Sequence, residues 1–229
     1  MSGRVRVATV HGPADLGDAL DAVDLGTARP VLVLIGGAGG LTRVLEDALR
    51  DVFAGCLSPL VQQLGAAIVD GGTESGVMRL IGRARAAAGH DYPLVGVAAA
   101  GTIGSPGGAV GSTAPIDPDH SHLVIVPGER WGDESPWLKA VAVAIARDRG
   151  RVALLVNGGR VAHDEAMDFA ASGIPVVVVA GSGRAADTLA ARLERERGED
   201  GLAGMIRVEL VDVTALRTAL ETSLATPAP

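Results

Sequence analysis

The sequence predicts an α/β protein in which helices cover both faces of an open, mostly parallel β-sheet. Short apolar runs alternate with amphipathic segments along nearly the whole chain, and this alternation is typical of β-α-β units. Most of the runs are apolar throughout, as expected for strands that are buried on both faces. Several of them end in glycine-rich turns. Together these observations predict a single domain over residues 1–229.

The composition supports one sizeable core and disfavours several classes of protein. The 229 residues are 48% hydrophobic and only 2% aromatic, so the core must be built from Val, Leu, Ile and Ala. A net charge of −7 argues against a nucleic-acid partner, which would need a basic face. The single cysteine, Cys56, excludes an intramolecular disulfide and a multi-cysteine metal site. Without a signal-peptide pattern or an apolar run of ~20 residues, we expect a cytoplasmic protein with no membrane partner.

Eight segments are predicted as strands and eight as helices. The strands are residues 4–10, 31–35, 66–69, 94–98, 122–126, 152–156, 176–180 and 206–211, and the helices are residues 13–23, 41–53, 58–64, 76–88, 135–149, 161–171, 184–197 and 214–224. The pair Ser58-Pro59 is typical of a helix cap followed by a first-turn proline. Residues 218–229 are expected to include a partly disordered tail. A TIM barrel also has eight strand–helix units, but the short chain and weak first strand favour an open sheet.

One stretch, AAIVDGGTESGVM at 66–78, is typical of a phosphate-binding turn. Its apolar start breaks into Gly71–Thr73, and a helix begins near Gly76. Glycines let the backbone approach a ligand, and a helix N-terminus presents unpaired N–H groups to an anion. Thr73 and Ser75 can cap this helix or donate to an oxyanion. The alternative is that the glycines serve only the turn.

Three further strands end in glycine-rich turns, at residues 36–40, 158–159 and 181–183. In an open parallel sheet the carboxyl ends of the strands meet at one edge, where ligands bind. Four such turns therefore predict a nucleotide-like ligand. The first turn does not fit the dinucleotide fingerprint, because it reads G-A-G-G-L-T from Gly37, with Thr42 in the place of the third glycine. An NAD-dependent dehydrogenase is disfavoured.

Arg184 is the most informative single residue in the sequence. It follows Gly181–Gly183 at the start of a helix, where the helix dipole makes a cation mildly unfavourable. Its guanidinium can bind a phosphate held at the same turn through two parallel hydrogen bonds. The alternative is an ion pair with Asp187, three residues further along the helix. We favour the phosphate contact.

Carboxylates follow the strand that ends before Pro127-Gly128. Glu129 or Glu134 on the ligand side of the sheet can stabilise a ribosyl cation during N-glycoside cleavage, or Asp133 and Glu134 can simply favour the helix N-terminus that follows. Hydrolysis by a serine or cysteine is disfavoured, because no G-x-S-x-G motif occurs and Cys56 has no obvious base beside it.

Two segments near the middle of the chain carry further hypotheses. His120-Ser121-His122, with Asp117 and Asp119 before it, either binds zinc or holds structural histidines at a strand entrance. We expect no metal, because no third His or Cys has ligand spacing nearby. Residues 99–120 lack periodicity and exceed the usual connection of ~4–6 residues, so we expect a functional loop or a lid.

Three motifs identify a family resemblance. GGTESGVM at 71–78, DPDHSHLVIV at 117–126 and GSGRAADTLA at 181–190 resemble the N-terminal cytosolic region of TRPM channels, and still more closely its bacterial counterpart, the LSDAT or TRPM-like branch of the SLOG superfamily. The resemblance spans about residues 30–197. It implies a Rossmann-like fold that binds a nucleotide-derived ligand such as ADP-ribose, and no cofactor is required for that role.

The resemblance and the glycine turns together select one set of ligand-binding residues. They are Gly36, Gly37, Ala38, Gly39, Gly40, Gly71, Gly72, Thr73, Ser75, Gly76, Val77, Met78, Gly101, Pro127, Gly128, Gly181, Ser182, Gly183, Arg184 and Asp187.

Two hypotheses for function follow. The first is a cytoplasmic sensor that binds ADP-ribose or a related NAD-derived nucleotide, with no catalytic residue. The second is a nucleotide N-glycosidase similar to the LOG-type phosphoribohydrolases, with Glu134 or Glu129 as the catalytic carboxylate. We rank it second, because residues 127–134 read P-G-E-R-W-G-D-E and lack the second glycine and the G-T pair of the motif P-G-G-x-G-T-x-x-E. The sequence leaves open a homo-oligomer and a separate effector protein.

Overall fold

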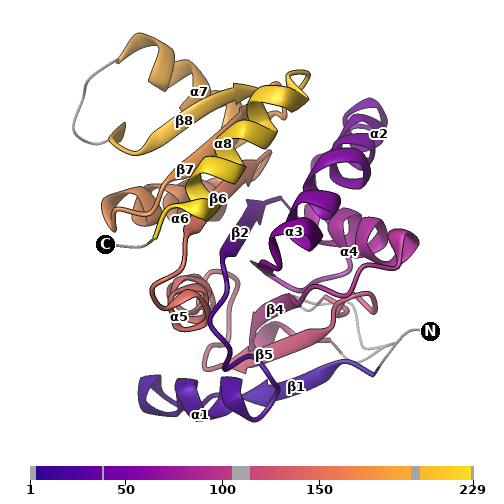
Figure 1. Cartoon of the computed structure of the whole chain (residues 1–229), viewed down its shortest axis with the longest axis vertical. Helices are drawn as coiled ribbons and strands as arrows, with labels where there is room; N and C mark the ends of the chain where they lie inside the picture. Colours follow the sequence, from indigo (N-terminus) through magenta and orange to yellow (C-terminus); the bar gives the residue numbers. More distant parts are fainter. Residues whose placement is uncertain (1–3, 38, 105–113, 197–201, 228–229) are drawn as a thin grey trace.

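In the part of the chain that the structure describes, eight parallel strands form one open sheet in the order β1-β5-β4-β3-β2-β6-β7-β8 (Figure 1). The computed structural model describes residues 4–37, 39–104, 114–196 and 202–227. The strands are β1 (Arg6–Thr9), β2 (Val31–Gly36), β3 (Ala67–Asp70), β4 (Leu94–Ala99), β5 (His122–Val126), β6 (Arg151–Val156), β7 (Val176–Ala180) and β8 (Met205–Glu209). The predicted α/β class is confirmed, and every strand pair in the sheet is parallel.

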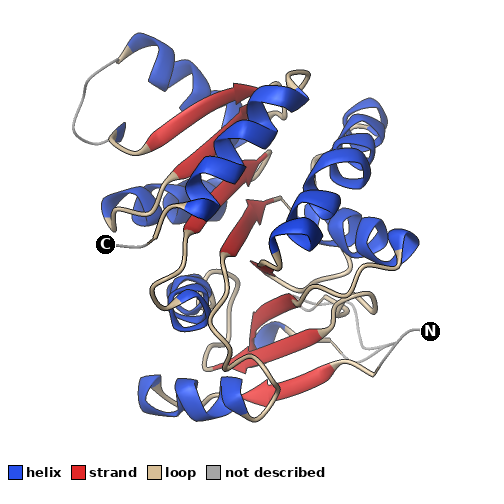
Figure 2. Cartoon of the chain, in the orientation of Figure 1, coloured by secondary structure: helices blue, strands red, loops and turns tan. Residues whose placement is uncertain are grey.

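Helices cover both faces of this sheet, as Figure 2 shows. On one face lie α1 (Leu16–Asp21), α5 (Ser135–Ala146), α6 (Arg160–Ala171) and α7 (Arg184–Arg195). On the other lie α2 (Arg43–Val52), the π-helical turn η2 (Phe53–Leu57), α3 (Ser58–Leu64), α4 (Gly76–Ala88) and α8 (Val213–Ala225). Two short 3-10 turns, η1 (Pro13–Asp15) and η3 (Ala100–Thr102), complete the described elements.

Strand β2 shows why the apolar runs read as strands. Its residues Val31–Ile35 are at most 2% exposed. Because successive side chains of a strand point to opposite faces, Val31, Val33 and Ile35 join the core under α5 and α6, whereas Leu32 and Leu34 join the core under α2 and α4. A strand with helices on both sides has no polar face, so alternation is lost from its sequence.

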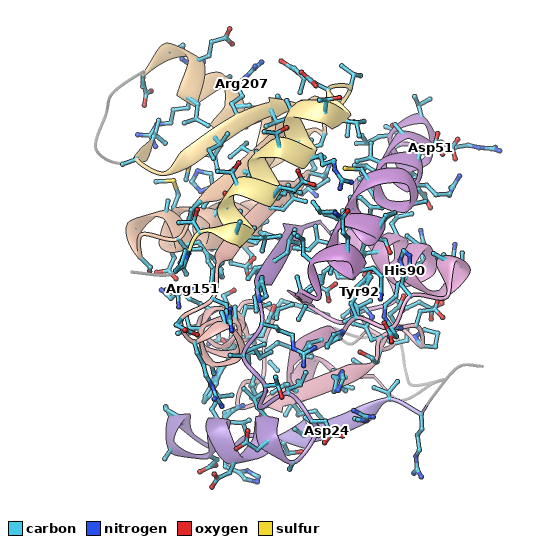
Figure 3. The ribbon with its side chains drawn as sticks, in the orientation of Figure 1. Asp24, Asp51, His90, Tyr92, Arg151 and Arg207 are labelled. Atoms are coloured by element: carbon cyan, nitrogen blue, oxygen red, sulfur yellow. The ribbon has the colours of Figure 1, made fainter. Side chains whose placement is uncertain are left out.

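The helical segment after β2 differs from the prediction. α2, η2 and α3 follow one another without a break, and Ser58 has helical backbone angles rather than those of a cap. Its hydroxyl is fully buried and lies 2.8 Å from His90 Nδ1 and 3.0 Å from the Tyr92 hydroxyl. Figure 3 labels His90 and Tyr92, which lie just before β4. Ser58 therefore joins α3 to that loop.

The helix predicted at residues 214–224 is confirmed by α8, which spans Val213–Ala225. Helix α8 continues to Ala225, and its Leu220 and Leu224 are buried. Residues 218–225, which fall within the range expected to include the tail, belong to this packed helix. None of the helices in the described part of the chain is long and apolar enough to cross a membrane.

Candidate functional site

A cavity of about 320 Å³ lies at the carboxyl edge of the sheet, next to the point where the strand order reverses. The chain places β3 on one side of β2 and later returns to place β6 on the other side. Ligands of open α/β sheets bind at such a crevice. Turns after several strands and the starts of α6 and α7 line the cavity. Its apolar lining consists of Leu34, Ile35, Met78, Val97, Ala98, Leu138, Val161 and Ala162.

Arg184 lies across the two glycine turns that flank the reversal point. Its Nη1 donates a hydrogen bond to the carbonyl oxygen of Gly39 at 3.0 Å. A Cβ added to Gly40 or to Gly159 would lie 3.1 Å from a guanidinium nitrogen, so both glycines make room for this side chain. The guanidinium also lines the cavity. It is therefore held where a ligand at the β2 and β6 turns would meet it.

The backbone of Arg184 is itself unusual. Its φ is +51°, and Asn157 at the end of β6 has a φ of +58°. Residues other than glycine rarely adopt this conformation, and such strain tends to collect at functional sites. Asp24 and Arg147 share it away from the cavity, so the strain alone does not mark a site.

Asn157 and Ser182 lock the turns after β6 and β7 together. The amide N–H of Asn157 donates to Ser182 Oγ at 2.8 Å, and Asn157 Nδ2 donates to the Ser182 carbonyl at 2.8 Å. Ser182 is fully buried, and its hydroxyl donates to the carbonyl of Val179. Asp187 is not paired with Arg184 but accepts a hydrogen bond from the Gly181 N–H at 2.7 Å. Ser182 and Asp187 therefore stabilise the turn after β7 through these hydrogen bonds.

The turn Gly71–Thr73 forms another part of the cavity wall. Gly71 and Thr73 line the cavity, and the Thr73 hydroxyl lies 3.0 Å from the Ser75 hydroxyl. Ser75 occupies the cap position of α4 without a side-chain bond to the helix. Gly72 has a φ of +66°, and a Cβ there would lie 2.7 Å from Gly96 Cα. Gly72 therefore serves close packing against β4.

A buried ionic cluster supports this turn from below. His120 Nε2 lies 2.8 Å from Asp70 Oδ1, and His120 Nδ1 lies 3.3 Å from Asp117 Oδ1. Asp70 Oδ1 also accepts the Gly72 N–H at 2.7 Å, while Asp70 Oδ2 is buried without a partner. Burial lowers the pKa of His120, but the two carboxylates outweigh it and raise the pKa to about 9. The imidazolium thus compensates two carboxylates beneath the turn.

The second histidine of the H-x-H pair is not part of this cluster. His122 Nε2 donates to the carbonyl of Val23 at 3.0 Å, and its Nδ1 lies 2.8 Å from the Ser121 hydroxyl. Burial and the nearby Arg6 lower the pKa of His122 to about 4, so it is neutral. Within the part of the chain that the structure describes, no group of three or more His, Cys, Asp and Glu residues is placed to hold a metal ion.

The turn after β5 places the two candidate carboxylates, Glu129 and Glu134, in different surroundings. Asp133 accepts the N–H groups of Glu129 and Arg130 at 2.9 and 3.0 Å, which lower its pKa. Glu129 is exposed and does not line the cavity. Glu134 does line it, is 9% exposed, and accepts the Gly132 N–H at 2.9 Å. Of the two carboxylates predicted from the sequence, Glu134 lines the cavity and Glu129 does not.

Glu165 on α6 is a second cavity carboxylate that the sequence analysis missed. Burial, the largest effect, raises its pKa to about 7, the hydrogen bond from Ser135 opposes the rise, and Glu134 and Asp164 add to it. Burial also raises the pKa of Glu134. The cavity therefore holds two carboxyl groups with raised proton affinity. Nothing local in the sequence of α6 marks Glu165, because its position depends on how α6 packs beside α5.

Trp131 and Arg160 were also missed, and both line the cavity. Trp131 is 44% exposed, which is high for an aromatic side chain. Arg160 follows the turn Gly158–Gly159 at the first position of α6, in the same way that Arg184 follows Gly181–Gly183 at the first position of α7. That repeated arrangement is a signal that could have found Arg160.

The predicted ligand-binding residues thus fall into three groups. Those that line the cavity are Gly36, Gly37, Gly71, Thr73, Met78 and Arg184. Those that lie in the turns and helix starts around it without lining it are Gly39, Gly40, Gly72, Ser75, Gly76, Val77, Gly101, Pro127, Gly128, Gly181, Ser182, Gly183 and Asp187. Ala38 lies outside the described residues.

The long connection 99–120 is tied to the site at both of its described ends. The Gly101 N–H donates to the Gly128 carbonyl at 2.9 Å, and the Asp117 N–H donates to the Gly72 carbonyl at 3.0 Å. Thr73 and Ile116 also form an antiparallel bridge. Residues 105–113, on which the lid hypothesis depends, lie outside the described residues.

Comparisons with known proteins identify the family. A family model described as "SLOG in TRPM, prokaryote" matches residues 29–222, which is most of the chain. The chain belongs to this prokaryotic SLOG family. The resemblance inferred from the motifs is therefore confirmed.

Two curated relatives of this SLOG domain are transient receptor potential cation channel subfamily M member 2 from mouse and from rat. Each is 27% identical, over 201 and 197 residues, and each match covers 70% of this chain but 13% of the channel. The chain therefore corresponds to a small part of those proteins. The X-ray structure of TM1055 has a TM-score of 0.60 at 20% identity, covering 84% of this chain and 99% of that one. This likeness supports the fold.

Proposed function

We propose that this SLOG domain is a cytoplasmic nucleotide sensor whose ligand is ADP-ribose or a related NAD-derived nucleotide. The observation that carries the proposal is the position of Arg184, which spans two glycine turns beside an apolar cavity. A phosphate needs donors and positive charge, and a base needs apolar surface. Both occur here within one site.

The phosphates would lie at the turns after β2 and β6. Gly36, Gly37 and Gly159 line the cavity with main-chain atoms, and Arg184 and Arg160 supply two guanidinium groups. Arg184 keeps a hydrogen bond to Gly39, so its orientation is fixed before the ligand arrives and less side-chain entropy is lost on binding.

The base would occupy the apolar part of the cavity. Its walls come from both sides of the sheet edge, including Leu34 on β2, Val97 on β4 and Leu138 on α5. The cavity volume of about 320 Å³ falls at the lower end of the ~300–1,000 Å³ typical of small-molecule sites. We expect a cavity of this size to hold one nucleoside. The signal would pass to a separate effector protein or through a homo-oligomer.

A thermal-shift screen tests this proposal most broadly. Nucleoside mono- and diphosphates, ADP-ribose, NAD and cyclic nucleotides are added to the protein, and each hit is titrated by calorimetry. A ligand at 100 times its Kd should stabilise the folded state by ~2.7 kcal/mol. Arg217→Ala, which removes a guanidinium on α8 paired with Glu221, serves as a matched control that leaves binding unchanged. Absence of any stabilising nucleotide would remove the proposal.

A second function, cleavage of a nucleotide N-glycosidic bond, is favoured by one observation. Glu134 and Glu165 face the same cavity, and burial raises the pKa of both. Such a pair can divide the roles of proton donor and ionised carboxylate. Incubation of each ligand with the protein, followed by chromatography for free base, decides between binding and turnover.

A further inference from the structure

A second cavity adjoins the first and shares a wall with it. It has a volume of about 480 Å³ and lies between α5 and α6. Five residues line both spaces: Trp131, Gly132, Arg160, Val161 and Glu165. Trp131 and Val161 are 44% and 41% exposed, so the shared wall presents apolar surface to both sides. A ligand can therefore continue from the first cavity into this groove.

The groove has a mixed lining in which charged side chains stand beside apolar ones, and the carboxylate of Glu165 has one oxygen without a hydrogen-bond partner in the described part of the chain. Lys139 is already paired with Asp168 and bonded to Ser172 Oγ. Asp164 lies 3.1 Å from His163 Nδ1. Glu165 accepts one hydrogen bond, from Ser135 Oγ to its Oε1 at 2.6 Å. Within the described residues Glu165 Oε2 has no partner, and the Ser135 contact fixes the direction in which it points.

We propose that the groove between α5 and α6 binds a hydroxyl-rich group, such as a ribose, that is attached to the outer phosphate of the nucleotide in the first cavity. Glu165 Oε2 accepts a hydrogen bond from a ribose hydroxyl, and the exposed face of Trp131 packs against the sugar ring. Arg160, at the junction of the two spaces, binds the outer phosphate. This inference rests on the proposed function and narrows its ligand to a nucleotide whose outer phosphate carries a second sugar.

The chemistry of the groove favours a sugar over other groups. Carboxylates are hydrogen-bond acceptors that match the donors of a vicinal diol, as in dinucleotide sites where an acidic residue binds ribose hydroxyls. A further phosphate would meet Asp164, Glu165 and Asp168, which repel an anion. An apolar group would leave Glu165 Oε2 desolvated without a partner.

Calorimetry with two ligands tests the inference. ADP carries only the nucleoside and the two phosphates, and ADP-ribose adds the second ribose. We expect ADP-ribose to bind the parent at pH 8 about 10-fold more tightly than ADP. In Glu165→Gln the ratio of the two Kd values should fall to about 2, because an amide replaces the ribose acceptor. Asp51→Asn, which changes an exposed carboxylate on α2 labelled in Figure 3, should keep the parent ratio.

A second variant protects the test against a change in folding. Asp164→Asn alters the groove alone, because Asp164 does not line the first cavity. It should leave the affinity for ADP unchanged and weaken ADP-ribose about 3-fold. If ADP binds the parent but ADP-ribose binds no more tightly, the second subsite is wrong while the nucleotide site stands. An unchanged ratio in Glu165→Gln also overturns the inference. If neither ligand binds, the proposed function fails as well.

Discussion

Replacement of Arg184 is the mutation that the site geometry constrains most closely. If Arg184 binds phosphate as proposed, Arg184→Ala removes a charge-assisted hydrogen bond worth roughly 1.5–3 kcal/mol. At ~1.4 kcal/mol per decade, the affinity for ADP should fall on the order of 10- to 100-fold. Arg184→Lys should recover only part of the loss, because an ammonium group cannot reproduce the planar fork of the guanidinium.

The backbone of Arg184 supplies an internal control for stability. Its φ of +51° is one that glycine adopts freely, whereas other residues are strained by ~1 kcal/mol or more. Arg184→Gly should therefore be more stable than Arg184→Ala by ~1 kcal/mol in urea titrations, while both lose affinity equally in calorimetry. Affinity in Arg184→Ala equal to that of the parent would refute a phosphate contact. If Arg184→Gly, the more stable variant, also bound ADP more tightly than Arg184→Ala, the phosphate contact would be refuted too.

Three further predictions concern the support of the site and its chemistry. Gly72→Val should destabilise the fold by ~3 kcal/mol or more in urea titrations, since its Cβ would lie 2.7 Å from Gly96 Cα at a φ of +66°; a stable variant would contradict that packing. The pKa of His120 is raised to about 9 from ~6.5 in the unfolded chain. Its contribution to the free energy of unfolding is therefore complete below pH 6.5 and is lost as the pH rises through 9. In denaturant titrations the free energy of unfolding should fall on the order of 3 kcal/mol over that pH range in the parent but not in His120→Gln. Equal pH profiles of the parent and the variant would argue against a charged histidine. Nucleoside monophosphates should release no free base, and steady release that disappears in Glu134→Gln would make the protein an enzyme.

Much of the fold could be predicted because its strands are buried on both faces. The run VLVLI at 31–35 has no polar position, so it reads as a central strand without reference to its neighbours. The order of the strands could not be predicted in the same way. β1 pairs with β5, more than a hundred residues away, and such pairing depends on how the whole chain packs.

The candidate site was predicted only where local sequence determines geometry. The glycine turn at 36–37 and Arg184 at a helix start are local features, and both line the cavity. Ser182 shows the opposite case. A serine in a glycine turn has the same sequence whether its hydroxyl faces a ligand or the turn, and here it faces the carbonyl of Val179. Glu165 enters the cavity only through the packing of two helices.

The central claim is that a nucleotide binds at the carboxyl edge of the sheet, with its phosphates at Arg184. A crystal structure of the protein soaked with ADP tests this most directly. We expect the diphosphate between the Gly36–Gly37 turn and the Arg184 guanidinium, within hydrogen-bond distance of both, and the base against Leu34 and Val97. ADP bound instead in the polar cavity at the opposite edge, beside Arg6 and Arg85, would contradict the account.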